Sequence, residues 1–208
     1  MTTRLRAFIA IALPPQVLLT ADNAQKKLRA DGIRLKWVRP ENMHLTLRFL
    51  GDIDRKQAPE IVTAISTAVK VMPPFALNVK RIGVFPNMRA PRVVWMGIEG
   101  ALELLMRLHQ RLADALDPIG FPPEPRAFTG HLTLGRLTDR ISPPLLQKAV
   151  LGSGQIESGM FTVDRICLIK SDLKPTGAVY TRLAEIFLKD NQETPANTIY
   201  RDIHQEES

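Results

Sequence analysis

Two identical tetrapeptides hold two of the four histidines in this chain. His-Leu-Thr-Leu occurs at His44–Leu47 and again at His131–Leu134. Both copies lie in short apolar stretches that predict β-strands. A repeat that places an ionisable and a hydroxyl side chain at the same two positions indicates a pair of matched sites.

The alternation of side chains along a strand predicts how each copy is oriented. His44 and Thr46 should share one face, with Leu45, Leu47 and Phe49 on the opposite face. The second copy has the same order, so His131 and Thr133 should lie in front of their leucines. If two lobes pack about a pseudo-twofold axis, the two polar pairs meet across a groove.

Two such pairs suit the hydrolysis of a phosphodiester. In-line displacement needs a base for the attacking water and an acid for the leaving oxygen, on opposite sides of phosphorus. Histidine serves either role near neutral pH, because its usual pKa is about 6.5. Threonine hydroxyls donate hydrogen bonds to the non-bridging oxygens. A strained cyclic diester lowers the barrier further, so the chemistry needs no metal.

Other interpretations of the two histidines are weaker. A single histidine in a strand is more often structural than catalytic, but a repeated His-x-Thr on a polar face favours catalysis. Zinc takes three or four ligands, and neither histidine has another ligand at a suitable spacing. No glycine-rich nucleotide loop is present. We therefore predict a site without metal or cofactor.

The elements around the repeat mix helices and antiparallel strands, without the regular alternation of a parallel sheet. Gly51-Asp52 should end the first histidine strand, and leucines at helical spacing (Leu102, Leu105, Leu112 and Leu116) should form an apolar stripe. Helices are expected from Pro14-Pro15 to Ala30 and over 58–71, 101–116 and 144–150. Strands are expected over 6–13, 44–50, 75–84, 92–98, 131–137, 160–170 and 178–188. Residues 171–177 should link the last two strands.

Composition sets wider limits. The 208 residues suit one bilobal domain over 1–188, followed by a polar, flexible tail over 189–208. The net charge of +7 favours polyanionic ligands. The single cysteine, Cys167, excludes an intramolecular disulfide and should be buried. The N-terminal apolar run is short and stops at Pro14-Pro15, so it predicts a strand and not a signal peptide. We expect a cytoplasmic protein with no membrane span and no obligate protein partner.

The residues around both motifs resemble a known family. The His-x-Thr words are similar to the signature of the 2H phosphoesterase superfamily. Residues 6–11, 37–51, 92–95, 128–136 and 171–180 resemble one branch, the RNA 2′,3′-cyclic phosphodiesterases or 2′-5′ RNA ligase-like proteins. The similarity extends in order over about residues 4–188. Gly130 stands where the family often has proline, with no consequence expected for the chemistry.

This resemblance implies a fold and an activity. The fold would be α+β and bilobal, with two antiparallel sheets flanking a central cleft and helices on the outer faces. The activity would convert RNA ending in 2′,3′-cyclic phosphate to a 2′-phosphate end, with His44 as proton donor and His131 as proton acceptor. Arg136 matches a family position near the phosphate, but its strand parity is opposite to that of His131, so a bulge or a strand end would be required to bring it in. Structural ion pairing is the other role open to Arg136.

The remaining candidates have ordinary explanations. His109 should be packed on its helix, Trp37 should belong to the core, and His204 lies in the tail. Arg89, Arg92 and Lys174 are loop cations that are either solvated or follow an RNA backbone. Two other functions stay open: a 2′-5′ RNA ligase or transferase that runs the same site in reverse, and a non-catalytic RNA- or nucleotide-binding module.

Overall fold

The computed structural model describes residues 4–154, 156–175, 177–188 and 199–200. Its helices are α1 Pro15–Ala30, α2 Ala58–Val69, α3 Leu102–Leu116 and α4 Pro143–Gly152. Three single 3-10 turns are η1 Pro40–Asn42, η2 Arg55–Gln57 and η3 Asp117–Ile119. The strands are β1 Arg4–Ala12, β2 Lys36–Trp37, β3 His44–Asp54, β4 Phe75–Phe85, β5 Val93–Gly100, β6 His131–Arg136, β7 Glu157–Val163, β8 Arg165–Lys174, β9 Gly177–Phe187 and β10 Ile199–Tyr200.

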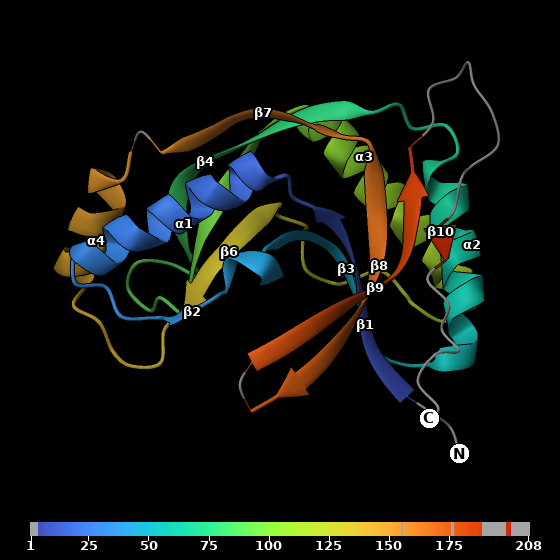
Figure 1. Cartoon of the computed structure of the whole chain (residues 1–208), viewed down its shortest axis with the longest axis horizontal. Helices are drawn as coiled ribbons and strands as arrows, with labels where there is room; N and C mark the ends of the chain where they lie inside the picture. The colour runs from blue at the N-terminus through green and yellow to red at the C-terminus, as the bar shows by residue number, and fades with distance from the viewer. Residues whose placement is uncertain (1–3, 155, 176, 189–198, 201–208) are drawn as a thin grey trace.

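The described strands form one curved antiparallel sheet (Figure 1). Its order is β10-β9-β8-β1-β3-β6-β5-β4-β7, and β2 pairs with β6 beside this path. The halves on either side of the β3–β6 boundary join through the pairing of Leu45 with Leu132. The α+β class and the antiparallel pairing are confirmed. The two expected sheets are the two halves of this continuous sheet.

Two helices cover each half of the sheet. Figure 1 shows α1 and α4 beside the half that contains β4, β6 and β7, and the Gln16 side chain of α1 donates to the Met160 carbonyl of β7. Helices α2 and α3 pack on each other, with α2 against β9 and α3 against β3. Helices α1 and α3 thus cover the half that does not contain the strand before them, which is β1 for α1 and β5 for α3. Helices α2 and α4 stay beside the half of the strand before them, which is β3 for α2 and β6 for α4.

Apolar burial explains this arrangement. The inward residues of the strands and helices form one large core, whereas the other face of β1 carries a small second cluster. That cluster contains Phe8, Ala10, Cys167 and Ile169, with Tyr180 packed against it. Cys167 is buried as predicted, and burial raises the pKa of its thiol to about 11. The thiol is therefore protonated at neutral pH.

Three element predictions were wrong. Gly51 does not end β3, because it adopts φ 72° at a register irregularity and the strand continues to Asp54. The expected strand 160–170 is two strands, since the chain leaves β4 and joins β1 on either side of Asp164. Residues 171–174 belong to β8, which meets β9 at the Lys174–Gly177 pair. In the helical stripe, Leu102 is exposed while Leu105, Leu112 and Leu116 are buried.

The C-terminal segment is described only at Ile199–Tyr200, where β10 pairs with Glu185 and Ala184 of β9. The flexible tail expected over 189–208 stays a prediction. The rest of the tail, including His204, lies outside the described residues. Among the helices that are described, none has the length and apolarity to cross a bilayer.

Candidate active site

Both motif histidines begin the strands that carry them. His44 is the first residue of β3 and His131 is the first residue of β6. In each copy the histidine and threonine are partly exposed while the leucines are buried, as the alternation predicts. The leucines anchor the strands in the core, and the polar side chains face the opposite side of the sheet.

The antiparallel register sets the two motifs against each other. Leu45 pairs with Leu132, so the neighbouring positions place Thr46 beside His131 and His44 beside Thr133. Each histidine therefore lies next to the threonine of the other motif. The four side chains surround a local pseudo-twofold axis, as the repeat predicts.

A main-chain carbonyl fixes each imidazole in the same way. His44 Nδ1 is 2.8 Å from the carbonyl oxygen of Asn42, and His131 Nδ1 is 2.7 Å from that of Thr129. Because a carbonyl only accepts, Nδ1 carries the proton in both rings. Nε2 is thus the nitrogen that remains for proton transfer in each ring. The Asn42 side chain in turn donates to the Ala178 carbonyl at 2.8 Å, which ties this turn to β9.

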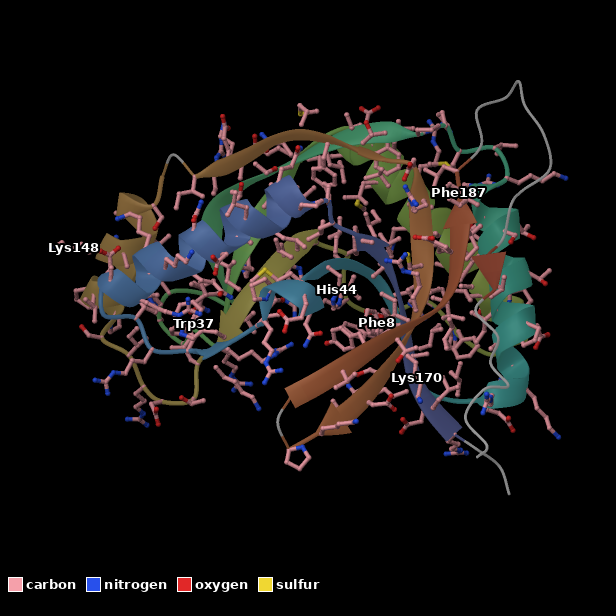
Figure 2. All side chains as sticks on the ribbon, in the orientation of Figure 1. Phe8, Trp37, His44, Lys148, Lys170 and Phe187 are labelled. Carbon is pink, nitrogen blue, oxygen red and sulfur yellow. The ribbon has the colours of Figure 1, made fainter. Side chains whose placement is uncertain are left out.

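Aromatic rings pack around His44. Phe8 stacks on the imidazole with ring centroids 4.5 Å apart. Figure 2 shows Phe8 and His44 close together. Tyr180 meets His44 edge-on at 5.3 Å and Phe8 at 5.1 Å. These contacts restrict the imidazole to one orientation.

His131 has a corresponding aromatic environment from the other half of the sheet. Phe85 lies edge-on to the imidazole at 5.0 Å, and Trp95 lies at 6.3 Å. Trp95 also packs on Phe85 at 4.7 Å and covers Gly83, where a Cβ would overlap the indole ring. The guanidinium of Arg126 lies 5.4 Å from the Phe85 ring centroid. Each histidine is thus packed against two aromatic rings, which come from different residues in the two cases.

The environment lowers the pKa of both imidazoles below 6.5. For His44 the main cause is burial, which the Asn42 hydrogen bond opposes and the charge of His131 reinforces. For His131 burial again lowers the pKa most, and the positive charges of Arg136 and Arg126 lower it further. The protonated form of each ring therefore becomes neutral at a lower pH than that of a solvated histidine.

A β-bulge brings Arg136 to the histidine face. Trp95 pairs with Thr133 and Val94 with Gly135, so Leu134 is the extra residue. Arg136 then pairs with Val93, and its side chain lines the same cleft as His131 and Thr133. The bulge that Arg136 requires is present.

A similar bulge makes one prediction wrong. In β3, Ile9 pairs with Arg48 and Ala10 with Thr46, so Leu47 is the extra residue. Phe49 consequently lies opposite Phe8 on the cleft face and not with the leucines. The sequence shows that Leu47 repeats as Leu134, but it does not show that Leu47 has no pairing partner in β1.

The cleft has a volume of about 260 Å³ and extends from the motifs toward α3. His109 lines it and stacks on Phe128 at 4.2 Å, so this histidine is packed as predicted but is also at the cleft wall. The cleft is lined by Thr46, Leu47, Arg48, Phe49, Phe85, Val93, His109, Glu124, Arg126, Ala127, Phe128, Thr129, His131, Thr133 and Arg136.

The sequence did not single out Phe8, Phe85, Trp95, Arg126 or Tyr180 as site residues. They come from separate strands and a loop, so no local spacing connects them with a motif. Among the other loop candidates, Arg89, Arg92 and Lys174 do not line this cleft, and Trp37 packs against the core as predicted. Within the described residues, no group of three or more His, Cys, Asp or Glu side chains has an arrangement suited to a metal ion.

This fold and this paired site are those of a two-histidine phosphoesterase. The family model described as "LigT like Phosphoesterase" matches twice, over residues 11–95 and 98–180, and each match contains one of the two His-x-Thr motifs. The chain belongs to the LigT-like phosphoesterase family.

Named relatives agree in length as well as sequence. An RNA 2′,3′-cyclic phosphodiesterase of Thermotoga maritima is 36% identical over 183 residues, which cover 87% of this chain and 94% of the relative. That of Methanothermobacter thermautotrophicus is 32% identical, covering 88% and 98%. A crystal structure of TT0787 from Thermus thermophilus superposes with a TM-score of 0.75 at 27% identity, covering 90% of this chain and 100% of that one. Escherichia coli LigT complexed with 3′-AMP gives 0.68 at 25% identity, with the same coverage.

Proposed function

We propose that this chain is an RNA 2′,3′-cyclic phosphodiesterase that opens a terminal cyclic phosphate to a 2′-phosphate. The observation that carries the proposal is the pair of equivalently oriented imidazoles, each beside the threonine of the other motif. The names of the relatives support the substrate class, and the nucleotide bound by the Escherichia coli protein supports a nucleotide in this fold.

In the proposed reaction, water attacks phosphorus in line with the bond to the 3′ oxygen. One imidazole takes a proton from the water through Nε2, and the other gives its Nε2 proton to the departing 3′ oxygen. The P–O3′ bond breaks, and the products are a 2′-phosphate and a free 3′-hydroxyl. By family analogy, His131 is the acceptor and His44 the donor. After one turnover the two rings have exchanged protonation states and re-equilibrate with solvent.

Thr46, Thr133 and Arg136 would hold the non-bridging oxygens. The hydroxyls flank the phosphate from both halves of the sheet, and Arg136 reaches the same cleft through its bulge. Hydrogen bonds to the charged phosphate strengthen as negative charge develops in the transition state. These three residues and the two histidines form a set that needs no metal ion.

The alternative functions use the same site differently. A 2′-5′ ligase or transferase would run the reaction backward, with an RNA hydroxyl attacking in place of water. A binding module would keep the groove without proton transfer. The carbonyl-fixed imidazoles favour catalysis, because binding alone does not require Nε2 to be kept free in both rings. The proposed RNA substrate and the single free cysteine fit a cytoplasmic enzyme.

The test is an assay of the purified protein on a short RNA with a 2′,3′-cyclic end, in the presence of EDTA. We expect a product with a 2′-phosphate and a free 3′-hydroxyl, identified by phosphorus NMR. The same RNA with a linear 3′-phosphate is the control and should not react. An unchanged cyclic end under all conditions would contradict the proposed function.

A further inference from the structure

Phe49 exposes a large apolar ring in the lining of the cleft. Its exposed fraction is 56%, and it is the only exposed aromatic residue among the described residues between Arg4 and Leu188. An aromatic side chain of this size is normally buried, because its apolar area is favourable to remove from water. A solvent-facing ring within a catalytic cleft indicates that a ligand covers it.

The pseudo-twofold axis relates Phe49 to Arg136. Each is the fifth residue after its motif histidine, and each reaches the cleft face because a bulge skips the last motif leucine. The same strand position therefore carries a cation in one half and an apolar ring in the other. The cleft has a phosphate end at Arg136 and an aromatic end at Phe49.

The aromatic end lies outside the rings that hold the two imidazoles. The described ring contacts of His44 and His131 are with Phe8, Tyr180, Phe85 and Trp95. Phe49 contacts Phe8 at 6.2 Å and follows Thr46 by three residues, which is about 10 Å along a strand. This distance separates it from the reacting phosphate and leaves room for a further part of the substrate.

The residues beside Phe49 are held by contacts of the buried side chain of Arg48. The side chain of Arg48 is 5% exposed, donates to the carbonyls of Phe121 and Pro122, and pairs with Glu124 at 3.8 Å. These contacts attach the loop over 121–128 to β3 beside Phe49. The loop carries Arg126 and Phe128, which line the cleft with Phe49.

We propose that Phe49 forms a subsite for the nucleobase of the nucleotide on the 5′ side of the cyclic-phosphate nucleotide. This proposal rests on the proposed function. It adds that the cleft binds the last two nucleotides of the RNA and not only the cyclic-phosphate nucleotide. Every nucleobase has a π-face that stacks on an aromatic ring, so the subsite accepts any base. The phosphodiester between the two nucleotides passes Arg126, whose guanidinium is exposed and charged.

The experiment compares three substrates with the wild-type protein. They are adenosine 2′,3′-cyclic phosphate, the same nucleotide with a 5′-phosphate, and the dinucleotide ApA with a 2′,3′-cyclic end. We expect kcat/KM to be higher for the dinucleotide than for either mononucleotide by about fivefold to a hundredfold, the usual effect of one stacked base. Equal kcat/KM for the 5′-phosphorylated mononucleotide and the dinucleotide would overturn the proposal, because a phosphate contact would then explain the gain.

The variant Phe49→Ala tests the ring itself. It should remove the dinucleotide advantage through a higher KM, so that kcat/KM falls more for the dinucleotide than for either mononucleotide. Phe49→Tyr should retain the advantage, since its ring also stacks. Met160→Ala, at a residue of β7 that is 57% exposed, is the matched control and should change nothing. Unfolding curves should show that each variant is folded.

The outcomes separate this proposal from the proposed function. If Phe49→Ala lowers all three rates equally, or lowers none, the ring does not read a second nucleotide and the proposal fails while the activity stands. If the wild-type protein hydrolyses none of the three substrates, the proposed function itself fails.

Discussion

Leu45 and Leu132 pair across the boundary between the two halves of the sheet, and both are fully buried. The residues that flank this pair, His44 with Thr133 and Thr46 with His131, are thereby placed side by side on the opposite face. Burial of two leucines thus sets the position of the proposed catalytic groups. The following predictions depend on that placement.

Replacement of either histidine should remove a proton-transfer group. His44→Ala or His131→Ala should lower kcat by at least about a hundredfold, the usual effect of general acid or base catalysis. Substrate binding should weaken far less, because both threonines and Arg136 are kept. If both rings act in one step, the double variant should be little slower than either single variant. Single-turnover rates and KM would measure this. Near-normal turnover by His131→Ala would contradict the proposal that the repeated histidines transfer protons.

The pH dependence of kcat/KM should be bell-shaped, with its maximum below pH 6.5. Catalysis needs one neutral and one protonated imidazole, and this state is most populated between the two pKa values. Burial lowers both of these pKa values below 6.5, so the maximum lies on the acidic side of an ordinary histidine. A rate profile between pH 4 and 9 would test this expectation. A maximum at pH 7.5 or above would contradict it.

Arg136→Gln should affect both the rate and the pH profile. Loss of charge-assisted hydrogen bonds to phosphate should lower kcat/KM by about ten- to a hundredfold. Because the charge of Arg136 lowers the pKa of His131, its removal should raise that pKa and move one limb of the profile to higher pH. Arg140→Gln is the control: it removes the same charge from an exposed residue that does not line the cleft. A lower rate with both limbs unmoved would mean that Arg136 does not act on His131.

Chelation should leave the rate unchanged. The proposed acid, base and phosphate contacts are all side chains of this chain, so excess EDTA should not alter kcat on a cyclic-phosphate RNA. Steady-state rates before and after dialysis against EDTA would measure this. Complete loss of activity that is restored by a divalent ion would instead place the protein among the metal-dependent hydrolases.

Gly83→Ala should displace Trp95. A Cβ at Gly83 would overlap the indole ring, so Trp95 must move away from its contacts with Phe85 and His131. We expect a loss of about 1–3 kcal/mol in the free energy of unfolding, as in other overpacked sites. The value of kcat should also fall, because His131 loses a packing partner. Denaturant unfolding and kcat would test both effects.

The matched control is Gly152→Ala at the end of α4. There the nearest atom to an added Cβ is Lys27 Nζ at 4.0 Å, so both quantities should stay near wild type. If Gly83→Ala is as stable and active as this control, the packing of Trp95 on His131 is not needed.

The repeat was sufficient to predict the paired strands, the faces of His44, Thr46, His131 and Thr133, and the α+β class. These features follow from local rules, because side-chain alternation and the burial of leucine act within a few residues. The same rules put Phe49 on the wrong face, and they did not decide on which face Arg136 lies. Their positions depend on which residue the partner strand skips, and that choice belongs to the pairing of β3 with β1 and of β6 with β5.

The sequence by itself therefore determined which groups can do chemistry: two histidines and two threonines, each backed by leucines. Only the tertiary structure decided how those groups are held. The carbonyls of Asn42 and Thr129 select the Nδ1 proton, and aromatic rings from four separate strands orient the imidazoles. The physical reason is that these contacts join segments far apart in the chain, where packing sets the neighbours and no spacing in the sequence records them.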